Sequence, residues 1–227
     1  MTQRVACVIP ALNAEPTLAS VVNGLRASLP ANTFIAAIDD GSIDGTHSVA
    51  QREADAVIRF PRNQGKGAAL RAGFAAALDQ GADVVVAVDA DGQHDPAFAP
   101  ALISALQTAD LAIGARVRSG STMPVGRRLT NALSAAAVGR CIGQPVADAQ
   151  CGFRAARAGV LAAVRPLSDR YEFETEFLIL AARRGYRIAF VPIPTRYGTD
   201  VPSQFRAFRD SARIIGTLWR YGTGTVP

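Results

Sequence analysis

Cysteine is scarce in this chain of 227 residues, in which only Cys7, Cys141 and Cys151 occur. Three widely separated cysteines exclude a disulfide framework and a cysteine-rich zinc site, because both need several cysteines at short spacings. The N-terminus also lacks a charged segment followed by an apolar one, which is the pattern of a secretory signal peptide. We therefore expect the protein to work in a reducing, cytoplasmic compartment.

Long apolar runs are absent as well. A membrane-spanning helix needs about 18 consecutive apolar residues, and the stretch LSAAAVGRCIG is interrupted by Arg140. Low-complexity segments and internal repeats are missing too, which excludes a disordered chain and a solenoid. With 49% hydrophobic residues, the chain suits one α/β domain, which we place at residues 1–200, followed by a basic C-terminal extension over 201–227.

Two phosphate-binding signatures are missing. No GxxxxGK[ST] loop occurs, which excludes a P-loop NTPase, and no GxGxxG follows a predicted strand, which disfavours a dinucleotide fold. The net charge of +5 would suit nucleic acid, but aromatic residues make up only 7% of the chain. They do not alternate with basic residues along a sheet, as surfaces that bind single strands require. We expect no nucleic-acid partner.

Lysine is nearly absent, since Lys66 stands against 23 arginines. This ratio suggests a coding bias, but the bias does not explain how the charges are distributed. Residues 1–115 hold seven basic and twelve acidic residues, a charge of −5, whereas residues 116–227 hold seventeen and seven, a charge of +10. An acidic first half suits a divalent cation, and a basic second half suits phosphate or an anionic surface.

Short β-branched runs alternate with helical patterns over the first 115 residues, which is typical of βαβ units on a largely parallel sheet. We predict strands at 5–9, 34–38, 56–60, 84–88 and 111–115. The i, i+3, i+4 spacing of Leu18, Val21 and Val22 predicts a helix after the first strand. A second helix is predicted over 65–81, where Gly81 ends it.

Polar clusters follow four of these strands, at 10–13, 39–46, 61–67 and 89–95. In such sheets, ligands bind outside the carboxyl ends of the strands, where helix N-termini also point at the ligand. We therefore predict one site that is assembled from four loops on one rim of the sheet.

Asp89 and Asp91 form an Asp-x-Asp pair after the fourth predicted strand. Extended backbone points both carboxylates to the same side, and their hard oxygens suit Mg²⁺ or Mn²⁺. Gln93 would add an oxygen ligand, and His94 a nitrogen ligand or a contact behind the ligands. The alternative is a solvated acidic turn, which is a common meaning of an isolated Asp-x-Asp.

Asp39 and Asp40 end a buried strand, directly before a glycine. Paired acids before a tight turn fit contacts to the base or the ribose hydroxyls of a nucleotide. The alternative is local, because Ser42 or Asp44 would cap the next helix. Lys66 lies between two glycines at a predicted helix start, where it would contact an anion.

In their order along the chain, these segments resemble family 2 glycosyltransferases of the GT-A (Rossmann-like) fold: VIPALNAE, DDGSIDGT, NQGKGAALRAGF, DADGQHDP, DAQCGFRA, YEFETEF and GYRIAFVPI. The chain looks most like the dolichyl-phosphate mannose or glucose synthase branch, from about Val5 to Tyr197. The resemblance implies a mostly parallel sheet flanked by helices, a nucleotide sugar donor (GDP- or UDP-hexose) and Mg²⁺ or Mn²⁺ at the Asp-x-Asp. It also implies inversion at the anomeric carbon and a polyprenyl phosphate acceptor.

The resemblance assigns roles to single residues as well. Asp89 would lie towards the donor sugar or ribose, while Asp91 and Gln93 would hold the metal. The residues that would bind the nucleotide sugar are Pro10, Ala11, Asn13, Glu15, Asp39, Asp40, Gly41, Lys66, Asp89 and Ala90.

Two positions depart from the family pattern. Where the family often has P-x-Y-N-E, this chain has Leu12 and Ala14, with Glu15 one place later, which leaves base recognition open. Cys151 stands where the synthases often have serine before Gly-Phe-Arg. The cysteine is closer to glucosyl-type members, so mannose and glucose both remain open.

In the resembling synthases, the region of Arg116, Arg127 and Arg128 grips the lipid phosphate, whose oxygens match guanidinium forks. The alternative is a solvated face of an arginine-rich protein. A phosphate acceptor is already ionised near neutral pH, so it needs little help from a base, whereas a hydroxyl acceptor would need one, such as Glu174 or Asp148.

YEFETEF predicts a helix over 172–177 on which Glu172 and Glu176 share one face and Glu174 points elsewhere. Glu174 is a candidate base, or else Glu174 or Glu176 anchors neighbouring arginines. The candidate catalytic residues are thus Asp89, Asp91, Arg116 and Glu174.

The C-terminal extension predicts a basic amphipathic helix. Its apolar stripe consists of Phe205, Phe208, Ala212, Ile215 and Trp219. Such a helix lies in an anionic membrane surface or docks on the core. We expect membrane contact, because a lipid acceptor requires an anchor where no span is present, and therefore a peripheral location at the cytosolic membrane face.

These features predict a metal-dependent inverting glycosyltransferase that moves a hexose from a nucleoside diphosphate sugar to a polyprenyl phosphate. Two alternatives remain. The acceptor would be a saccharide or small-molecule hydroxyl, or the chain would be a non-catalytic GT-A protein that docks to a membrane.

Overall fold

The computed structural model describes residues 3–116, 125–194, 216–217 and 220–221, with backbone alone for 125–130. The described part of the chain forms one seven-stranded sheet in the order β3-β2-β1-β4-β6-β5-β7. The strands are β1 (Val5–Ala11), β2 (Phe34–Asp39), β3 (Ala56–Arg59), β4 (Val84–Ala87), β5 (Leu111–Arg116), β6 (Arg154–Arg157) and β7 (Ile188–Ile193). All pairs are parallel except those of β6, which is antiparallel to β4 and to β5.

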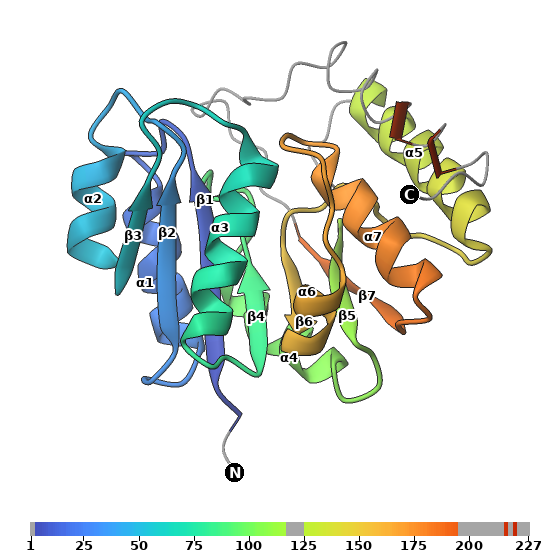
Figure 1. Ribbon diagram of the computed structural model, residues 1–227, viewed down its shortest axis with the longest axis horizontal. Helices are drawn as coiled ribbons and strands as arrows, with labels where there is room; N and C mark the ends of the chain where they lie inside the picture. The colour runs from blue at the N-terminus through green and yellow to red at the C-terminus, as the bar shows by residue number, and fades with distance from the viewer. Residues whose placement is uncertain (1–2, 117–124, 195–215, 218–219, 222–227) are drawn as a thin grey trace.

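Helices cover both faces of this sheet (Figure 1). The helices are α1 (Leu18–Ser28), α2 (Thr46–Glu53), α3 (Lys66–Asp79), α4 (Ala99–Ala105), α5 (Val125–Ile142), α6 (Ala158–Ala163) and α7 (Phe173–Arg183), with the 3₁₀ turn η1 (Pro96–Phe98). Helix α1 contacts α2 and α4, whereas α3 contacts α6 and α7. The mostly parallel α/β architecture predicted from the sequence is confirmed.

All five predicted strands are present, with ends that differ by at most two residues. Two further strands were not predicted. The sequence of β6, RAAR, carries no β-branched residue, so its strand conformation comes from hydrogen bonding to a neighbour on each side. Strand β7 pairs with β5 at the end of the described sheet, and such an edge position accommodates Pro192.

The second predicted helix, α3, ends as the sequence indicates. Gly81 has a φ of +69°, and its N–H donates to the carbonyl of Leu78 at 2.8 Å. The N–H of Ala82 donates to the carbonyl of Ala77 at 3.2 Å. This pair of hydrogen bonds is a Schellman motif, which requires a left-handed residue at the position of Gly81.

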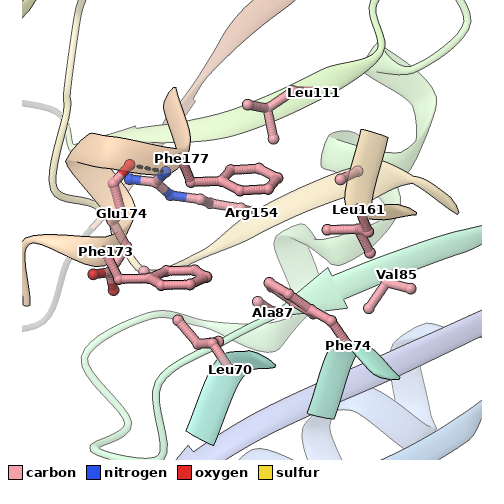
Figure 2. Close-up of a pocket in the computed structure, with 12 residues that line it drawn as sticks. Leu70, Phe74, Val85, Ala87, Leu111, Arg154, Leu161, Phe173, Glu174 and Phe177 are labelled. Atoms are coloured by element: carbon pink, nitrogen blue, oxygen red, sulfur yellow. Dashed lines mark hydrogen bonds between the residues drawn. The ribbon is translucent and has the colours of Figure 1, made fainter. Parts of the chain in front are cut away.

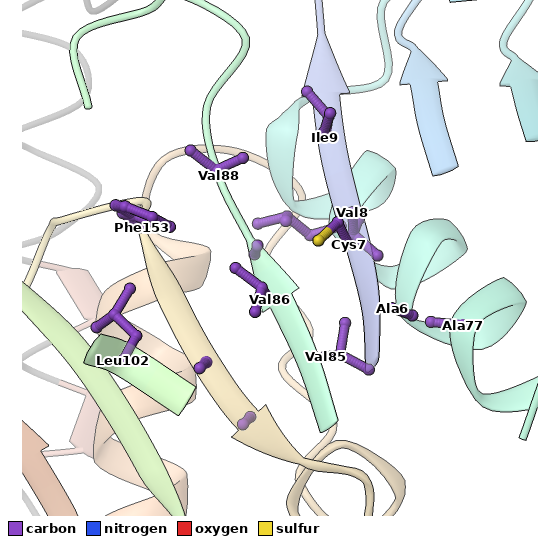
Figure 3. Close-up of a cluster of buried hydrophobic side chains, with 14 of the residues drawn as sticks. Ala6, Cys7, Val8, Ile9, Ala77, Val85, Val86, Val88, Leu102 and Phe153 are labelled. Carbon is purple, nitrogen blue, oxygen red and sulfur yellow. The ribbon is translucent and has the colours of Figure 1, made fainter. Parts of the chain in front are cut away.

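The core is centred on β1 and β4, whose residues are all buried. Figure 3 shows their side chains facing Phe153 and Leu102 on one side and α3 on the other. Burial on both faces explains why these strands read as continuous apolar runs. Cys7 belongs to this core, where burial raises the pKa of its thiol to about 12, and the three cysteines are free.

Helix α7 is buried along most of its length, from Phe173 to Ala181. The predicted helix is therefore present, but it begins after Glu172. Both Glu174 and Glu176 are buried, because α7 packs against α3 on one side and α5 on the other.

The C-terminal extension contacts α7 through Tyr221. Thr217 and Tyr221 are buried, and the hydroxyl of Tyr221 donates to Glu176 Oε1 at 2.6 Å. Arg183 donates to the backbone carbonyl of Tyr221. These contacts favour docking on the core at these positions, while the residues of the predicted stripe lie outside the described residues: Phe205, Phe208, Ala212, Ile215 and Trp219.

In the described ranges, no helix has both the length and the apolar character that crossing a membrane requires.

Gly73 allows α3 to lie directly on the sheet. A Cβ at this position would lie 2.2 Å from Val8 Cγ1 and 2.7 Å from Ile38 Cδ1. We expect Gly73→Ala to lower the free energy of unfolding by about 1–3 kcal/mol through overpacking, measured by chemical denaturation. Gly159→Ala is the control, because no heavy atom lies within 4 Å of its Cβ position. Equal stability of both variants would contradict this packing.

Candidate active site

The direction in which successive strands are added to the sheet reverses between β1 and β4. Strand β1 continues through α1 to β2 on one side of it, whereas β3 returns through α3 to β4 on the other side. Such a switch point leaves a crevice at the carboxyl ends of the strands, where ligands bind in open α/β sheets. Pro10 and Ala11 end β1, and Asp89 and Ala90 follow β4, so these four predicted residues border the crevice.

Asn13 and Glu15 join the loop after β1 to the loop after β2. Asn13 has a φ of +49°, and its Oδ1 accepts a hydrogen bond from Ile43 N at 3.0 Å. Glu15 Oε2 accepts one from Gly45 N at 2.9 Å. Asp44 accepts hydrogen bonds from Thr46 at the start of α2, in line with the capping alternative. The two predicted nucleotide ligands thus have local partners that shape the rim.

Asp39 and Asp40 have different surroundings although they are adjacent. Asp39 is fully buried and accepts a hydrogen bond from Ser42 N at 2.8 Å. Asp40 accepts two, from Gln64 N at 2.6 Å and Gly65 N at 2.9 Å. Burial nevertheless raises the pKa of Asp40. Asp40 therefore holds the loop that leads into α3.

Gly41 lets these two loops touch. Its φ is +75°, and a Cβ there would lie 2.5 Å from the backbone carbonyl carbon of Arg62. A side chain at position 41 would force the loops apart, so the backbone alone requires the glycine of the DDG sequence.

Lys66 lies between two carboxylates. Its Nζ is 2.5 Å from Asp89 Oδ1 and 2.5 Å from Glu174 Oε1. The lysine side chain is only 14% exposed and that of Glu174 only 4%. The structure thus brings three predicted site residues together from α3, the loop after β4 and α7. We call Lys66, Asp89 and Glu174 the lysine bridge.

Burial by itself would lower the pKa of Lys66 and raise that of Asp89, because it penalises each charged form. The short ion pairs outweigh this effect, so the pKa of Lys66 lies above its usual range and that of Asp89 lies below. Glu174 Oε2 is buried without a hydrogen-bond partner among the described residues. Within the lysine bridge itself, one ammonium faces two carboxylates, so its three side chains carry one surplus negative charge. The charges of Arg116 and Arg154 act on Asp89 from outside the bridge.

Asp91 lies beside this surplus charge. Burial, followed by repulsion from Asp89, raises its pKa to about 6. Its Oδ1 accepts a hydrogen bond from Gln93 N at 3.0 Å. A carboxylate and an amide oxygen are the donor types that Mg²⁺ and Mn²⁺ prefer, and a cation would relieve the repulsion. The residues present therefore fit such an ion.

No group of three or more His, Cys, Asp and Glu side chains able to hold a metal forms among the described residues. An ion held by Asp91 and Gln93 would need further oxygen ligands. Substrate phosphates supply such ligands in many magnesium sites.

His94 packs away from the rim. Its Nε2 lies 3.7 Å from Cys151 Sγ, and its ring stacks obliquely on Phe153 with centroids 5.9 Å apart. Burial lowers the pKa of His94 to about 4, so the ring is neutral at physiological pH. These contacts are with core side chains, so both roles expected for His94 at a metal site stay predictions.

Arg116, at the end of β5, forms a two-pronged ion pair with Asp148. Its Nε lies 2.6 Å from Asp148 Oδ2 and its Nη2 lies 2.9 Å from Oδ1. Burial opposes ionisation of Asp148, but the hydrogen bonds and charge of Arg116 lower its pKa. The side chains of the other two predicted phosphate ligands, Arg127 and Arg128, lie outside the described residues.

Arg154 was not singled out by the sequence analysis, although it stands in the CGFR segment. Its guanidinium is buried and donates to three backbone carbonyls, those of Cys151 (2.6 Å), Ala149 (2.8 Å) and Glu174 (2.7 Å). Figure 2 shows the last of these bonds. Arg154 therefore ties the loop that carries Asp148 to the start of α7. A local pattern gave no signal for it, since all its partners are backbone groups.

An apolar cavity lies behind Glu174, between α3, the sheet and α7 (Figure 2). Its volume is about 20 Å³, enough for about one water molecule. It is too small for a sugar, so it belongs to the core.

Gly152 touches Asp89 directly. A Cβ at Gly152 would lie 2.2 Å from Asp89 Oδ2, so the loop before β6 fixes the position of this carboxylate together with Lys66.

Carboxylates that come together at a switch point of an α/β sheet are suited to a protein that binds nucleoside diphosphates with a cation. Comparison with known families defines the class. Residues 6–165 match the model of Glycosyl transferase family 2. The chain belongs to this family, as the resemblance predicted, and is a glycosyltransferase.

Two relatives are named for polyprenyl acceptors. The chain is 34% identical over 224 residues to undecaprenyl-phosphate mannosyltransferase of Micrococcus luteus, covering 94% of this chain and 90% of the relative. It is 34% identical over 205 residues to polyprenol monophosphomannose synthase of Mycolicibacterium smegmatis, covering 85% and 77%.

The fold also matches glucosyl-3-phosphoglycerate synthase of Mycobacterium tuberculosis in complex with UDP, with a TM-score of 0.77 and 26% identity over 97% of this chain and 80% of that one. Another structure of that enzyme holds Mn²⁺, UDP-glucose and phosphoglyceric acid. These matches confirm a GT-A-like fold. The roles of single site residues stay predictions.

We expect Gly152→Ala to displace Asp89 and to lower kcat/KM for glycosyl transfer by about 100-fold, since a misplacement of about 1 Å in a site has effects of this size. Steady-state kinetics would measure the loss, and circular dichroism would verify the fold. Gly159→Ala again serves as the control, and its activity should match that of the wild type. Full activity of Gly152→Ala would mean that Asp89 does not need this position.

Proposed function

We propose that this protein is a metal-dependent, inverting glycosyltransferase that moves a hexose from a nucleoside diphosphate sugar to a polyprenyl phosphate. The observation that carries the proposal is the pair of neighbouring carboxylates at the β1/β4 switch point, where repulsion from Asp89 helps to raise the pKa of Asp91. The names of the two mannosyltransferase relatives support the acceptor class.

Asp91 and Gln93 would hold Mg²⁺ or Mn²⁺. When bound, the ion would offset the charge that develops on the departing diphosphate. The Mn²⁺ in a related solved structure supports this assignment. The protein's own part is to hold donor and acceptor in line, with Asp89 fixed by Lys66 and Gly152 towards the donor.

The state of the two candidate bases favours a phosphate acceptor. Asp148 is held by Arg116 with a lowered pKa, and Glu174 Oε1 lies 2.5 Å from the ammonium of Lys66. A carboxylate that is paired with a cation is a weak proton acceptor. A phosphate acceptor is ionised already, so it can attack the anomeric carbon without either group.

Arg116 borders the site at the end of β5, and Arg127 and Arg128 follow in α5. We assign these arginines to the acceptor phosphate, by the resemblance. The donor is a GDP- or UDP-hexose, with mannose supported by the two polyprenyl relatives and glucose by the solved structure with UDP-glucose. The protein would act as a peripheral protein at the cytosolic membrane face.

A second candidate is transfer to a hydroxyl of a phosphorylated small molecule. It is favoured by one observation, the phosphoglyceric acid bound in a related solved structure. In that case, Glu174 or Asp148 would have to leave its cationic partner to act as a base.

Asp91→Ala should abolish glycosyl transfer without unfolding the chain, because Asp91 is the carboxylate of the two predicted metal ligands, whereas Gln93 is a neutral amide. Transfer of a radiolabelled hexose to polyprenyl phosphate, with Mn²⁺ present, would measure the effect. Asp79→Ala removes an exposed carboxylate at the end of α3 and should keep wild-type activity. Near-normal activity of Asp91→Ala, or transfer that persists in a chelator, would remove the metal role.

The acceptor class can be tested with matched lipids. We expect transfer to a polyprenyl phosphate and none to the polyprenol of the same chain length, because only the phosphate is ionised near pH 7. Phosphoglycerate should also fail as an acceptor. The measurement is product formation from GDP-mannose, GDP-glucose and UDP-glucose in parallel. Transfer to phosphoglycerate alone would instead favour the second candidate.

A further inference from the structure

Lys66 lies between two of the carboxylates of the proposed site, Asp89 and Glu174. Its Nζ lies 2.5 Å from one oxygen of Asp89 and 2.5 Å from one oxygen of Glu174. Its charge also acts on Asp91, whose ionised form it favours. Within the described part of the chain, Lys66 is therefore the cationic residue that forms an ion pair with the Asp-x-Asp pair.

We propose that Lys66 is a tethered counter-cation. In the free protein it neutralises Asp89 and keeps a divalent cation from binding alone, and it transfers to the diphosphate of the donor when nucleotide and cation bind together. This inference rests on the metal role proposed above and adds an order of binding to it.

The main chain around Lys66 is fixed. A Cβ at Gly65 would lie 2.3 Å from the carbonyl oxygen of Asp169, and one at Gly67 would lie 2.5 Å from that of Ser168. Ala68 N also donates to the Asp169 carbonyl at 3.2 Å. The start of α3 is thus packed against this segment, so the ammonium can change partners only by rotation of the lysine side chain.

The helix itself favours exchange of a carboxylate for a diphosphate. Lys66 is the first residue of α3, where the helix dipole is positive and a cation is unfavourable unless an anion lies close by. In the free protein, Asp89 and Glu174 are these anions. A diphosphate at the helix N-terminus would satisfy both the dipole and the ammonium.

The donor set for the metal is incomplete without nucleotide. The described residues contain no group of three acidic, histidine or cysteine ligands, and Lys66 repels a cation from Asp89. Binding of Mn²⁺ to the free protein should therefore be weak. The diphosphate would bring oxygen ligands and draw the ammonium away from Asp89 in the same event.

The decisive measurement is Mn²⁺ binding to the nucleotide-free protein, from the electron paramagnetic resonance signal of free Mn²⁺. We expect Lys66→Met to bind Mn²⁺ at least about tenfold more tightly than the wild type, since a unit charge a few ångströms away has at least this effect near a protein surface. Lys66→Arg keeps the charge and should stay as weak as the wild type. Its transfer activity should nevertheless fall, because a guanidinium does not fit between the two carboxylates as an ammonium does.

Arg71→Met is the matched control. It removes one positive charge from the same helix, but Arg71 pairs with Asp169 on the outside. Its affinity for Mn²⁺ should not rise.

Lys66→Met leaves two carboxylates without their partner, which can prevent folding. The double variant Lys66→Met/Glu174→Gln removes both partners of the Lys66–Glu174 ion pair, so that only Asp89 loses its cation, and it leaves Asp89 and Asp91 in place. It too should bind Mn²⁺ more tightly than the wild type. Wild-type affinity in a folded Lys66→Met or double variant, or an equal gain in Arg71→Met, would overturn the proposal.

The proposed change of partner of the Lys66 ammonium, from Asp89 to the diphosphate, can be observed directly, because the chain contains a single lysine. Lysine labelled with ¹³C at Cε gives one side-chain signal in the nuclear magnetic resonance spectrum. We expect this signal to move on addition of GDP or UDP with Mg²⁺, and not with Mg²⁺ alone. A signal that stays in place while a thermal shift reports nucleotide binding would overturn the transfer step.

These measurements use neither sugar nor acceptor, so they are independent of the acceptor test. If transfer requires a metal but Lys66→Met has wild-type affinity for Mn²⁺, only the counter-cation role fails. If transfer does not require a metal, the proposed metal role fails with it.

Discussion

The arrangement of the site depends on the ion pairs that offset the carboxylates at the carboxyl ends of the buried strands. Asp89, Asp91 and Glu174 come together where the parallel strands end, and Lys66 forms short ion pairs with Asp89 and Glu174. The ion pairs are short enough to overcome the cost of burial, and the charges of Arg116 and Arg154 also act on Asp89. A cation bound beside Asp91 would relieve the repulsion between Asp89 and Asp91, which is why we proposed a metal role for this pair.

Close backbone contacts give the site its geometry. Gly41, Gly65 and Gly152 each lie against another loop or against the Asp89 carboxylate, with no room for a Cβ. Asp40 and Arg154 add hydrogen bonds from one loop to the next. Several residues of the family motifs therefore act by holding the rim together.

The same loop contacts explain which parts of the site were readable in the sequence. Asp39, Asp40, Asp89 and Asp91 stand directly after apolar strands, so their common rim followed from strand periodicity and parallel topology. Arg154 was missed because its partners are carbonyl groups. The pairing of Lys66 with Glu174, more than a hundred positions apart, leaves no local pattern either. Glu174 was expected as a base or as an anchor for arginines; its carboxylate pairs with Lys66, and its backbone carbonyl accepts a hydrogen bond from Arg154.

By itself, the sequence determined the α/β class, the five strands it predicted, the end of α3 at Gly81 and the family, since these follow from local periodicity, a left-handed turn and motif order. The tertiary structure decided the rest: the antiparallel β6, whose RAAR sequence forms a strand only between two neighbours, the docking of Tyr221 on α7, and the partners of each charge. Ion pairs such as Arg116 with Asp148 depend on distance and burial, and these exist only once remote segments have packed together.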